Sequence, residues 1–317
     1  MAQHFLLSAA ARTLSLKAVF KMGEDAAYEA FRAMRWPDGE ASCPRCGCCE
    51  TYSITSRRRF KCVGCHHQFS VTSGTIFASR KLSYTDLLAA IVIFVNGAKG
   101  ISALQVSRDL DVQYKTAFVL SHKLREAMAL EAQGRVLDGV VEVDGAYFGG
   151  YVKPANHKEN RRDRRLVANQ SGKRQSVVVI RERDGDTNTY VRESEAAGVA
   201  DVRACVDADA TIHADEASHW DILHGSHDAK RINHSACYSD GTACTNMAES
   251  FFSRLRRAEI GVHHHIAGPY LNAYAGEMAW REDNRRVANG SQAGMVVHSA
   301  MVSPVSRQWK GYWQRAA

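Results

Sequence analysis

Apolar and polar positions divide the chain into a helical first part and a mixed second part. Residues 14–35 and 82–131 carry apolar side chains at helical spacing. Within the second stretch, Ser83 is a candidate helix N-cap and Gly97 a candidate helix end. The run IVIFV, residues 91–95, is far too short to span a bilayer, so we predict that it lies in a core helix.

A pair of helices is predicted between residues 101 and 130. The first covers 101–109, residues 110–112 form a short turn, and the second covers 113–130. This order is typical of a helix-turn-helix, in which the first residues of the second helix can face the major groove of DNA. Simple packing of two helices is the alternative. The apolar positions that suggest the motif are Ile101, Leu104, Leu110, Val112, Ala117, Leu120 and Leu124, and the exposed helix start would be Gln113, Tyr114, Lys115 and Thr116.

Short strands become the dominant pattern after residue 136. A strand over 140–143 is predicted to end at Asp144, and residues 175–194 form two strands joined through Asp184-Gly185. Further along, a helix (195–207), a strand leading to Asp215, a short strand (229–235) and a helix (245–257) are predicted. Strands followed by alternating helices and strands favour a mixed α/β sheet.

Two matched cysteine pairs predict a metal module near the N-terminus. CPRC (43–46) and CVGC (62–65) have the spacing of a tetrahedral zinc ribbon, with a hairpin between the pairs and an extended stretch, HQFSVTSGTIF, after them. Gly47 and Gly64 would ease the turn in each knuckle. The predicted zinc ligands are Cys43, Cys46, Cys62 and Cys65; Cys48, Cys49, His66 and His67 are the nearby alternatives, and Cys205, Cys237 and Cys244 are interpreted as structural.

Three acids have positions that suit a catalytic metal site. Asp144 and Asp215 would lie at strand ends, and Glu249 lies one turn before an arginine cluster in TNMAESFFSRLRR. Carboxylate oxygens are preferred by Mg²⁺, and a pair of such ions can run phosphoryl transfer. We expect Asp144 to bridge Mg²⁺ or Mn²⁺ ions that Asp215 and Glu249 hold individually. Each acid could instead be an ordinary surface acid, and Glu142 and Glu216 compete with the two aspartates.

Charge gives a broader indication of the partner. The formal net charge is +7, and arginines gather at 57–59, 161–174 and 254–257. Unpaired arginines at three places suggest a nucleic-acid track, whereas solvated loops are the alternative. The closely spaced cysteine pairs and the lack of a membrane-length apolar run favour a reducing, cytoplasmic setting without a membrane. The residues predicted to contact DNA are Arg57, Arg58, Arg59, Lys115, Arg254, Arg256 and Arg257.

These motifs, in this order, resemble the DDE transposases of bacterial insertion sequences, and most closely the ISXO-type group. The matching stretches are CPRC…CVGC, FSVTSGTIF, VEVDGAYFGG, IHADEAS, INHS, TNMAESFFSRLRR and GVHHHIAGPYLNAYAGEMAWREDNRR. The resemblance implies a ribonuclease-H-like catalytic domain with Asp144, Asp215 and Glu249 as its catalytic acids. One departure is Gly145, where such proteins often carry another acid. His234 and the His263–His265 run have no assigned role.

The resemblance also implies a reaction and a domain order. Water would cleave double-stranded DNA at the ends of a mobile element, and the exposed 3′-hydroxyl would attack target DNA, which calls for a homo-oligomer on DNA in the bacterial nucleoid. A nuclease without strand transfer, a zinc-ribbon DNA-binding regulator and an inactive remnant are the alternatives. The expected divisions are an N-terminal helical segment (1–37), a zinc ribbon (38–80), a helical region (81–133), the transposase domain (134–290) and a tail (291–317).

Overall fold

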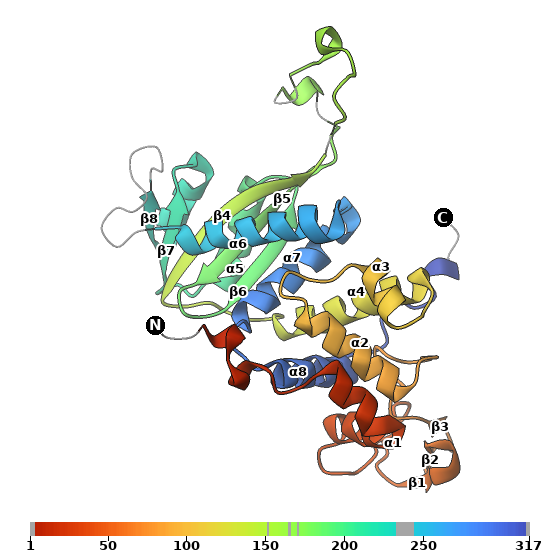
Figure 1. Ribbon diagram of the computed structural model, residues 1–317. Coiled ribbons are helices and arrows are strands. Elements are labelled where there is room, and N and C mark those ends of the chain that lie inside the picture. The colour runs from red at the N-terminus through yellow and green to blue at the C-terminus, as the bar shows by residue number, and fades with distance from the viewer. Residues whose placement is uncertain (1–3, 151, 164–165, 170, 233–243, 315–317) are drawn as a thin grey trace. The chain divides into compact units, whose positions relative to one another are not determined.

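The computed structural model describes residues 4–150, 152–163, 166–169, 171–232 and 244–314. The chain forms two compact units, and each is described by itself (Figure 1). One unit combines Met1–Glu131 with Asn284–Ala317, and the other is Ala132–Asp283. The chain therefore leaves the first unit, builds the second as one continuous segment, and returns.

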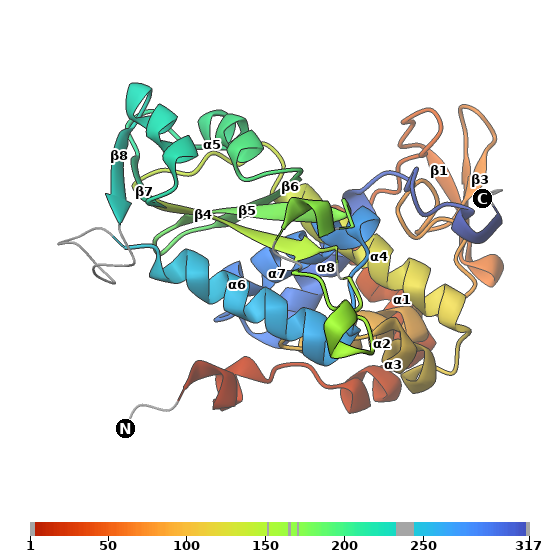
Figure 2. The same ribbon diagram turned by 90° about the horizontal axis from the view of Figure 1, so that it is seen from above.

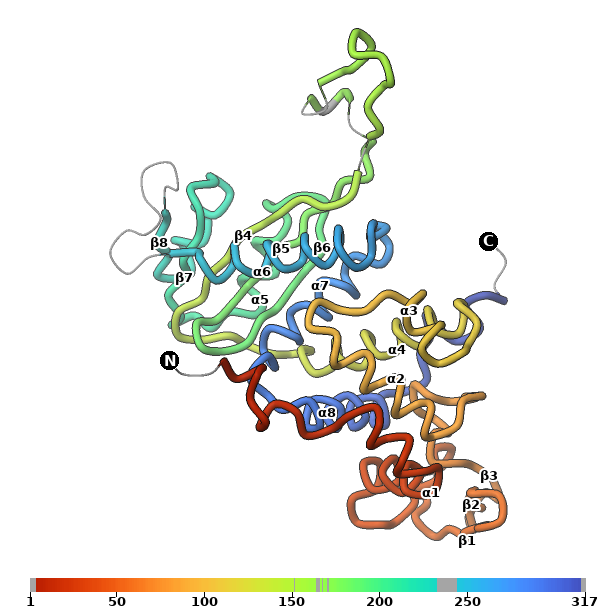
Figure 3. Tube along the Cα trace, viewed as in Figure 1, coloured from red at the N-terminus to blue at the C-terminus, as the bar shows by residue number. Residues whose placement is uncertain are grey.

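The first unit is helical apart from a small sheet. The predicted helices of this region are confirmed, and α8 returns beside α1, α2 and α4 (Figure 3). The Ser83 side chain accepts a hydrogen bond from the Asp86 N–H at the start of α2, as its predicted cap role requires. Of the apolar positions assigned to the helix pair, Leu104 is half-exposed, so it does not serve the core. The helices are α1 (Leu16–Arg35, kinked at Gly23), α2 (Tyr84–Asn96), α3 (Ala103–Asp109), α4 (Tyr114–Glu131) and α8 (Asn289–Val302).

The small sheet is the ribbon, with strands β1 (Thr51–Ile54), β2 (Arg59–Cys62) and β3 (Gln68–Phe69) in antiparallel order. Its core is a short aromatic stack, in which Trp36 meets Phe60 edge-on at 5.3 Å and Phe60 stacks on Phe69 at 5.6 Å. The extended stretch predicted over HQFSVTSGTIF is wrong beyond Phe69. Turns replace it, because Ser73 Oγ accepts the Ser70 N–H and holds the chain in a bend.

The second unit is built on a five-stranded mixed sheet in the order β6-β5-β4-β7-β8. The pairs β4–β5 and β5–β6 are antiparallel, whereas the pairs β4–β7 and β7–β8 are parallel. This arrangement confirms the predicted mixed α/β class. The strands are β4 (Val140–Gly149), β5 (Arg174–Glu182), β6 (Thr187–Arg192), β7 (Thr211–Asp215) and β8 (Asp228–Ile232), and the helices are α5 (Val199–Cys205), α6 (Asn246–Ala258) and α7 (Gly268–Asp283).

Helices cover both faces of this sheet, and each face has its own apolar core (Figure 2). Val141 and Val143 of β4 pack with α5, whereas Ala146 and Phe148 pack with α6 and α7. Because neighbouring side chains of a strand point to opposite faces, Glu142 and Asp144 lie on the α6 face. The alternation along β4 thus decides which carboxylates can reach α6.

One strand boundary was predicted wrongly. Strand β4 is ten residues long and runs on to Gly149, so Asp144 lies in the middle of the strand and not at its end. The antiparallel pairing with β5 runs on to Gly149↔Arg174, whereas the parallel pairing with β7 stops at Val143↔Ala214. Asp144 is therefore the first residue of β4 beyond its pairing with β7.

No helix within the described residues is both long enough and apolar enough to cross a bilayer. IVIFV lies in α2 and is buried throughout, as predicted for a core helix.

Candidate active site and metal centre

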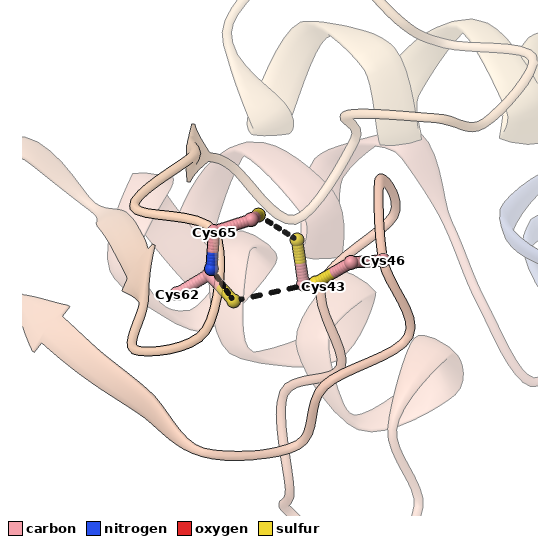
Figure 4. Close-up of side chains that lie close together, drawn as sticks. All are labelled: Cys43, Cys46, Cys62 and Cys65. Carbon is pink, nitrogen blue, oxygen red and sulfur yellow. Dashed lines mark hydrogen bonds between the residues drawn. The ribbon is translucent and has the colours of Figure 1, made fainter.

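Four cysteine thiols converge between the two knuckles of the ribbon (Figure 4). The ligand atoms of Cys43, Cys46, Cys62 and Cys65 all lie within 4.8 Å of one another. Cys43 Sγ is 3.7 Å from Cys65 Sγ, and Cys46 Sγ is 3.6 Å from Cys62 Sγ. Four sulfurs placed about 2.3 Å from a tetrahedral zinc lie about 3.8 Å apart, so the cluster has the dimensions of a zinc site.

The two knuckles have the same backbone shape but different residues at the turn. The Gly47 N–H donates to the Cys43 carbonyl and the His66 N–H donates to the Cys62 carbonyl, and both residues have positive φ, 76° and 57°. The second turn therefore relies on His66 in the left-handed region, and the turn role predicted for Gly64 is wrong. Burial raises the pKa of the Cys43 thiol, but N–H donors of Arg45 and Cys46 lower the pKa overall, to about 7.

The alternative ligands lie outside the cluster. Cys48 Sγ approaches the carbonyl of Glu50 and Cys49 Sγ that of Gly47, each at 3.7 Å. Among the described residues, the four predicted cysteines form the group that is close enough to hold one ion. Cys205, the last residue of α5, is buried in the core, in agreement with a structural role, and Cys237 lies outside the described residues.

Asp144 and Asp215 come together at the edge where β4 and β7 stop pairing. Val143 pairs with Ala214, so the two aspartates follow on neighbouring parallel strands. Asp144 Oδ1 accepts the Gly145 N–H at 2.7 Å, and Asp215 Oδ1 accepts the Ala217 N–H at 3.1 Å. Each aspartate thus has one carboxylate oxygen held by the backbone.

Glu249 joins these aspartates from α6. It lies on the exposed side of that helix with Asn246, Ser253 and Arg256, whereas Phe251, Phe252 and Leu255 are buried. Burial and, to a lesser extent, the charges of Asp215, Glu195 and Glu249 raise the pKa of Asp144 to about 7, while the hydrogen bond from the Gly145 N–H acts in the opposite direction. The three predicted acids are therefore electrostatic neighbours, although they are less tightly gathered than the four thiols.

Sequence reasoning missed Glu195, a fourth acid in this cluster. Its own pKa is raised by burial and by the charge of Asp215, and its Oε2 lies 3.8 Å from Nε2 of His219. A Cβ at position 145 would overlap with Cγ of Glu195. The departure noted at Gly145 therefore makes room for a carboxylate from another part of the chain. The only sequence signal was the missing side chain at position 145.

Glu142, the predicted competitor of Asp144, has a different role. Its side chain is fully buried and accepts hydrogen bonds from the Met247 and Ala248 N–H groups, at 2.7 and 3.2 Å. Arg183 Nε donates to its other oxygen at 3.0 Å. A carboxylate at these free N–H groups caps the first turn of α6 and complements the positive end of the helix. Glu142 thereby fixes the helix that carries Glu249 against the strand that carries Asp144.

Two of the predicted DNA-contacting arginines are not unpaired. Arg58 forms ion pairs with Glu24 and Asp25, and Arg254 forms one with Glu282. Arg257 donates to Ser253, and Arg256 lies 5.9 Å from the centre of the Phe148 ring. The expectation of unpaired arginines is therefore wrong for Arg58 and Arg254. Arg57, Arg59, Lys115, Arg256 and Arg257 are exposed.

The histidines without an assigned role remain so. His263 contacts the Tyr274 ring edge-on at 4.5 Å, which is a packing contact, and His264 has a φ of 59° in an exposed turn. His234 lies outside the described residues.

The five-stranded mixed sheet has the strand order of a ribonuclease-H-like domain, and Asp144 lies on the face that α6 covers. A four-cysteine ribbon precedes this domain in the chain. Comparison with protein families agrees: residues 136–283 match the ISXO2-like transposase domain, and residues 22–68 match the transposase zinc-ribbon domain. The chain therefore carries the zinc-ribbon and catalytic domains of ISXO2-like DDE transposases, in the order that its motifs predicted. Searches of curated proteins and of solved structures gave no significant match.

Proposed function

We propose that this transposase binds the terminal inverted repeats of a mobile DNA element, cleaves the DNA strand there and joins the exposed 3′ end to target DNA. The observation that carries the proposal is the convergence of Asp144, Asp215 and Glu249 on one face of the sheet. These residues come from positions far apart in the sequence, and in the fold the charges of Asp215 and Glu249 act on Asp144. The family of the domain supplies the reaction class.

The acid cluster suits divalent cations. Several carboxylates near the half-buried Asp144 repel one another, and a bound cation would relieve this repulsion. Mg²⁺ or Mn²⁺, when bound as a pair, would activate the attacking oxygen and stabilise the leaving one. Asp144 would lie between the ions, and Asp215 and Glu249 would each hold one. The backbone N–H groups of Gly145 and Ala217 keep the two aspartate side chains oriented for this task.

DNA contacts would come from exposed cations in both units. Lys115 lies in the exposed first turn of α4, where a helix-turn-helix places residues that meet the major groove. Arg57 and Arg59 lie at the turn of the ribbon hairpin, and Arg256 and Arg257 lie in the last turn of α6. We expect Arg58 and Arg254 to contribute less, because each would have to give up an internal ion pair.

The assembly and setting follow from the reaction. Two element ends must be held together for joining, so we propose a dimer or larger assembly on DNA. Because zinc-binding thiols must be reduced and the proposed substrate is DNA, we expect the protein to act in the bacterial cytoplasm, on the nucleoid.

The test uses labelled element ends, an unlabelled target and Mg²⁺. The wild-type protein should cut the ends and yield joined products. Asp215→Asn should reduce both by about a thousandfold or more, since it removes a ligand of the metal pair. Glu216→Gln is the matched control, because Glu216 is the adjacent exposed acid.

Each of the other outcomes favours a different class of function. Cutting without joined products would favour the nuclease alternative, and specific binding without cutting would favour the regulator. Equal cleavage by Asp215→Asn and wild type would remove Asp215 from the proposed chemistry.

A further inference from the structure

A pocket of about 370 Å³ lies within the first unit, whereas the acid cluster belongs to the second. Its walls come from residues 77–82, the first half of α4 and residues 309–314 near the C-terminus. This volume is at the lower end of the roughly 300–1,000 Å³ that small-molecule pockets span, and most of the lining surface is apolar.

Aromatic rings form much of the lining and are fixed in place. Trp309 is buried and stacks on His122 at 4.2 Å, and Tyr312 lies 4.8 Å from Trp309. Trp313 is perpendicular to Tyr312, and its Nε1 donates to the Lys115 carbonyl at 3.3 Å. Trp313 nevertheless keeps 47% of its surface exposed. A rigid ring with an open face is suited to stacking on a flat ligand.

Four cations also line this apolar pocket: Arg80, Lys81, Lys115 and Lys123. The lining contains no carboxylate, and within the described part of the chain none of the four forms an ion pair. Lys115 Nζ lies 5.2 Å from the centre of the Trp313 ring, so a cation stands directly beside the exposed aromatic ring. Burial lowers the pKa of Lys123, although the charge of Glu126 acts in the opposite direction, so its ammonium group is poorly solvated there.

We propose that this pocket binds one unstacked base of a DNA strand, with the adjoining phosphates on the lysines and the arginine. The base would stack on Trp313 and Tyr312, because every base offers a flat π face to an aromatic ring. The charge complementarity selects this occupant: an apolar peptide would fill the pocket but would bring no anion to the four cations, whose lining contains no carboxylate. The inference rests on the proposed DNA-binding function. It adds a specific site at which the protein would hold a DNA strand through one unpaired nucleotide.

The experiment compares two short duplexes that differ only in a single-stranded 3′ overhang. One overhang carries bases, and the other is abasic and keeps its phosphates. Fluorescence anisotropy with the full-length, zinc-loaded protein should give about tenfold tighter binding of the overhang with bases. Trp313→Ala should lose this preference and bind both duplexes as wild type binds the abasic one. Phe20→Ala, which removes a similarly exposed ring outside the pocket, should keep it.

A second variant tests the phosphate contacts. Lys123→Met keeps the apolar stem and removes the charge. It should weaken binding of both overhangs and reduce the slope of log K against log salt by about 0.7, the value for one phosphate contact on a single strand. An unchanged slope would overturn the assignment of phosphates to this wall.

The remaining outcomes separate the two proposals. Equal wild-type affinity for the two overhangs, or a preference that survives Trp313→Ala, would overturn the base pocket while leaving DNA binding intact. A protein that binds neither duplex would overturn the proposed function, and the pocket inference would fall with it. Unchanged melting temperatures would show that the variants are folded.

Discussion

Asp144 is the residue on which the electrostatics of the site converge. It lies near three other acids, is half-buried, and has a pKa raised to about 7. A structural carboxylate would be better placed at the surface or beside a cation. The ionised form of Asp144 is therefore unfavourable in the absence of a bound cation, as expected of a metal-binding site.

Replacing Asp144 with asparagine should stabilise the metal-free site at neutral pH. An unfolded aspartate loses its proton near pH 3.9, whereas folded Asp144 keeps its proton up to pH of about 7. Between these values the native state binds more protons, so the free energy of unfolding falls as the pH rises. In magnesium-free buffer, Asp144→Asn should raise Tm by roughly 2 °C or more at pH 7.5 and leave it unchanged at pH 4. A variant that melts below wild type at pH 7.5 would contradict this account.

Gly145 and Glu195 should be coupled. Gly145→Ala would place a Cβ on the Glu195 side chain and displace it, which we expect to lower stability by about 1–3 kcal/mol. Adding Glu195→Ala should recover much of that loss, because the overlapping atoms are gone. Urea unfolding of the two single variants and the double variant measures the coupling. Strictly additive effects would show that Glu195 does not occupy this space.

At the scale of elements, the sequence predicted helices better than the longest strand. Ser83 and Gly97 bracket α2 as predicted, because capping is a local property that the sequence carries. The extension of β4 beyond Asp144 was missed, since Gly145 and the following residues are held by pairing with β5, far along the chain. Strand ends depend on such partners more than on local preference.

The packing of α6 against β4 should depend on the hydrogen bonds of Glu142. Glu142→Ala would leave Arg183 and two helix N–H groups without their buried acceptor. We expect a loss of about 3 kcal/mol in the free energy of unfolding, measured by urea denaturation. Glu216→Ala, at an exposed acid, should change it by less than about 0.5 kcal/mol. A loss below about 1 kcal/mol for Glu142→Ala would argue against the proposed role of Glu142 in holding α6 against β4.

For the whole molecule, the sequence predicted a set of acids but not what surrounds them. The order of motifs and the family resemblance predicted one site for Asp144, Asp215 and Glu249, and in the fold the charges of Asp215 and Glu249 act on Asp144. Glu195 and the ion pairs of Arg58 and Arg254 were missed, because they depend on contacts between residues distant in sequence. The structure thus adds the packing that hydrophobic patterning cannot specify.

Removing zinc should unfold the ribbon while the sheet of the second unit stays protected. The ribbon has only a short aromatic core, so metal binding contributes most of its folding free energy. Cys43→Ser should therefore abolish protection from hydrogen exchange in β1 and β2 but not in β4. Cys49→Ser, outside the cluster, is the control. Retained protection in β1 and β2 would contradict a structural zinc.

The most direct test of the central claim is the anomalous scattering of Mn²⁺ in crystals of the full chain with an element end. The account predicts two peaks roughly 4 Å apart, in contact with the carboxylates of Asp144, Asp215 and Glu249. Peaks elsewhere, or no manganese at these acids with DNA bound, would contradict it.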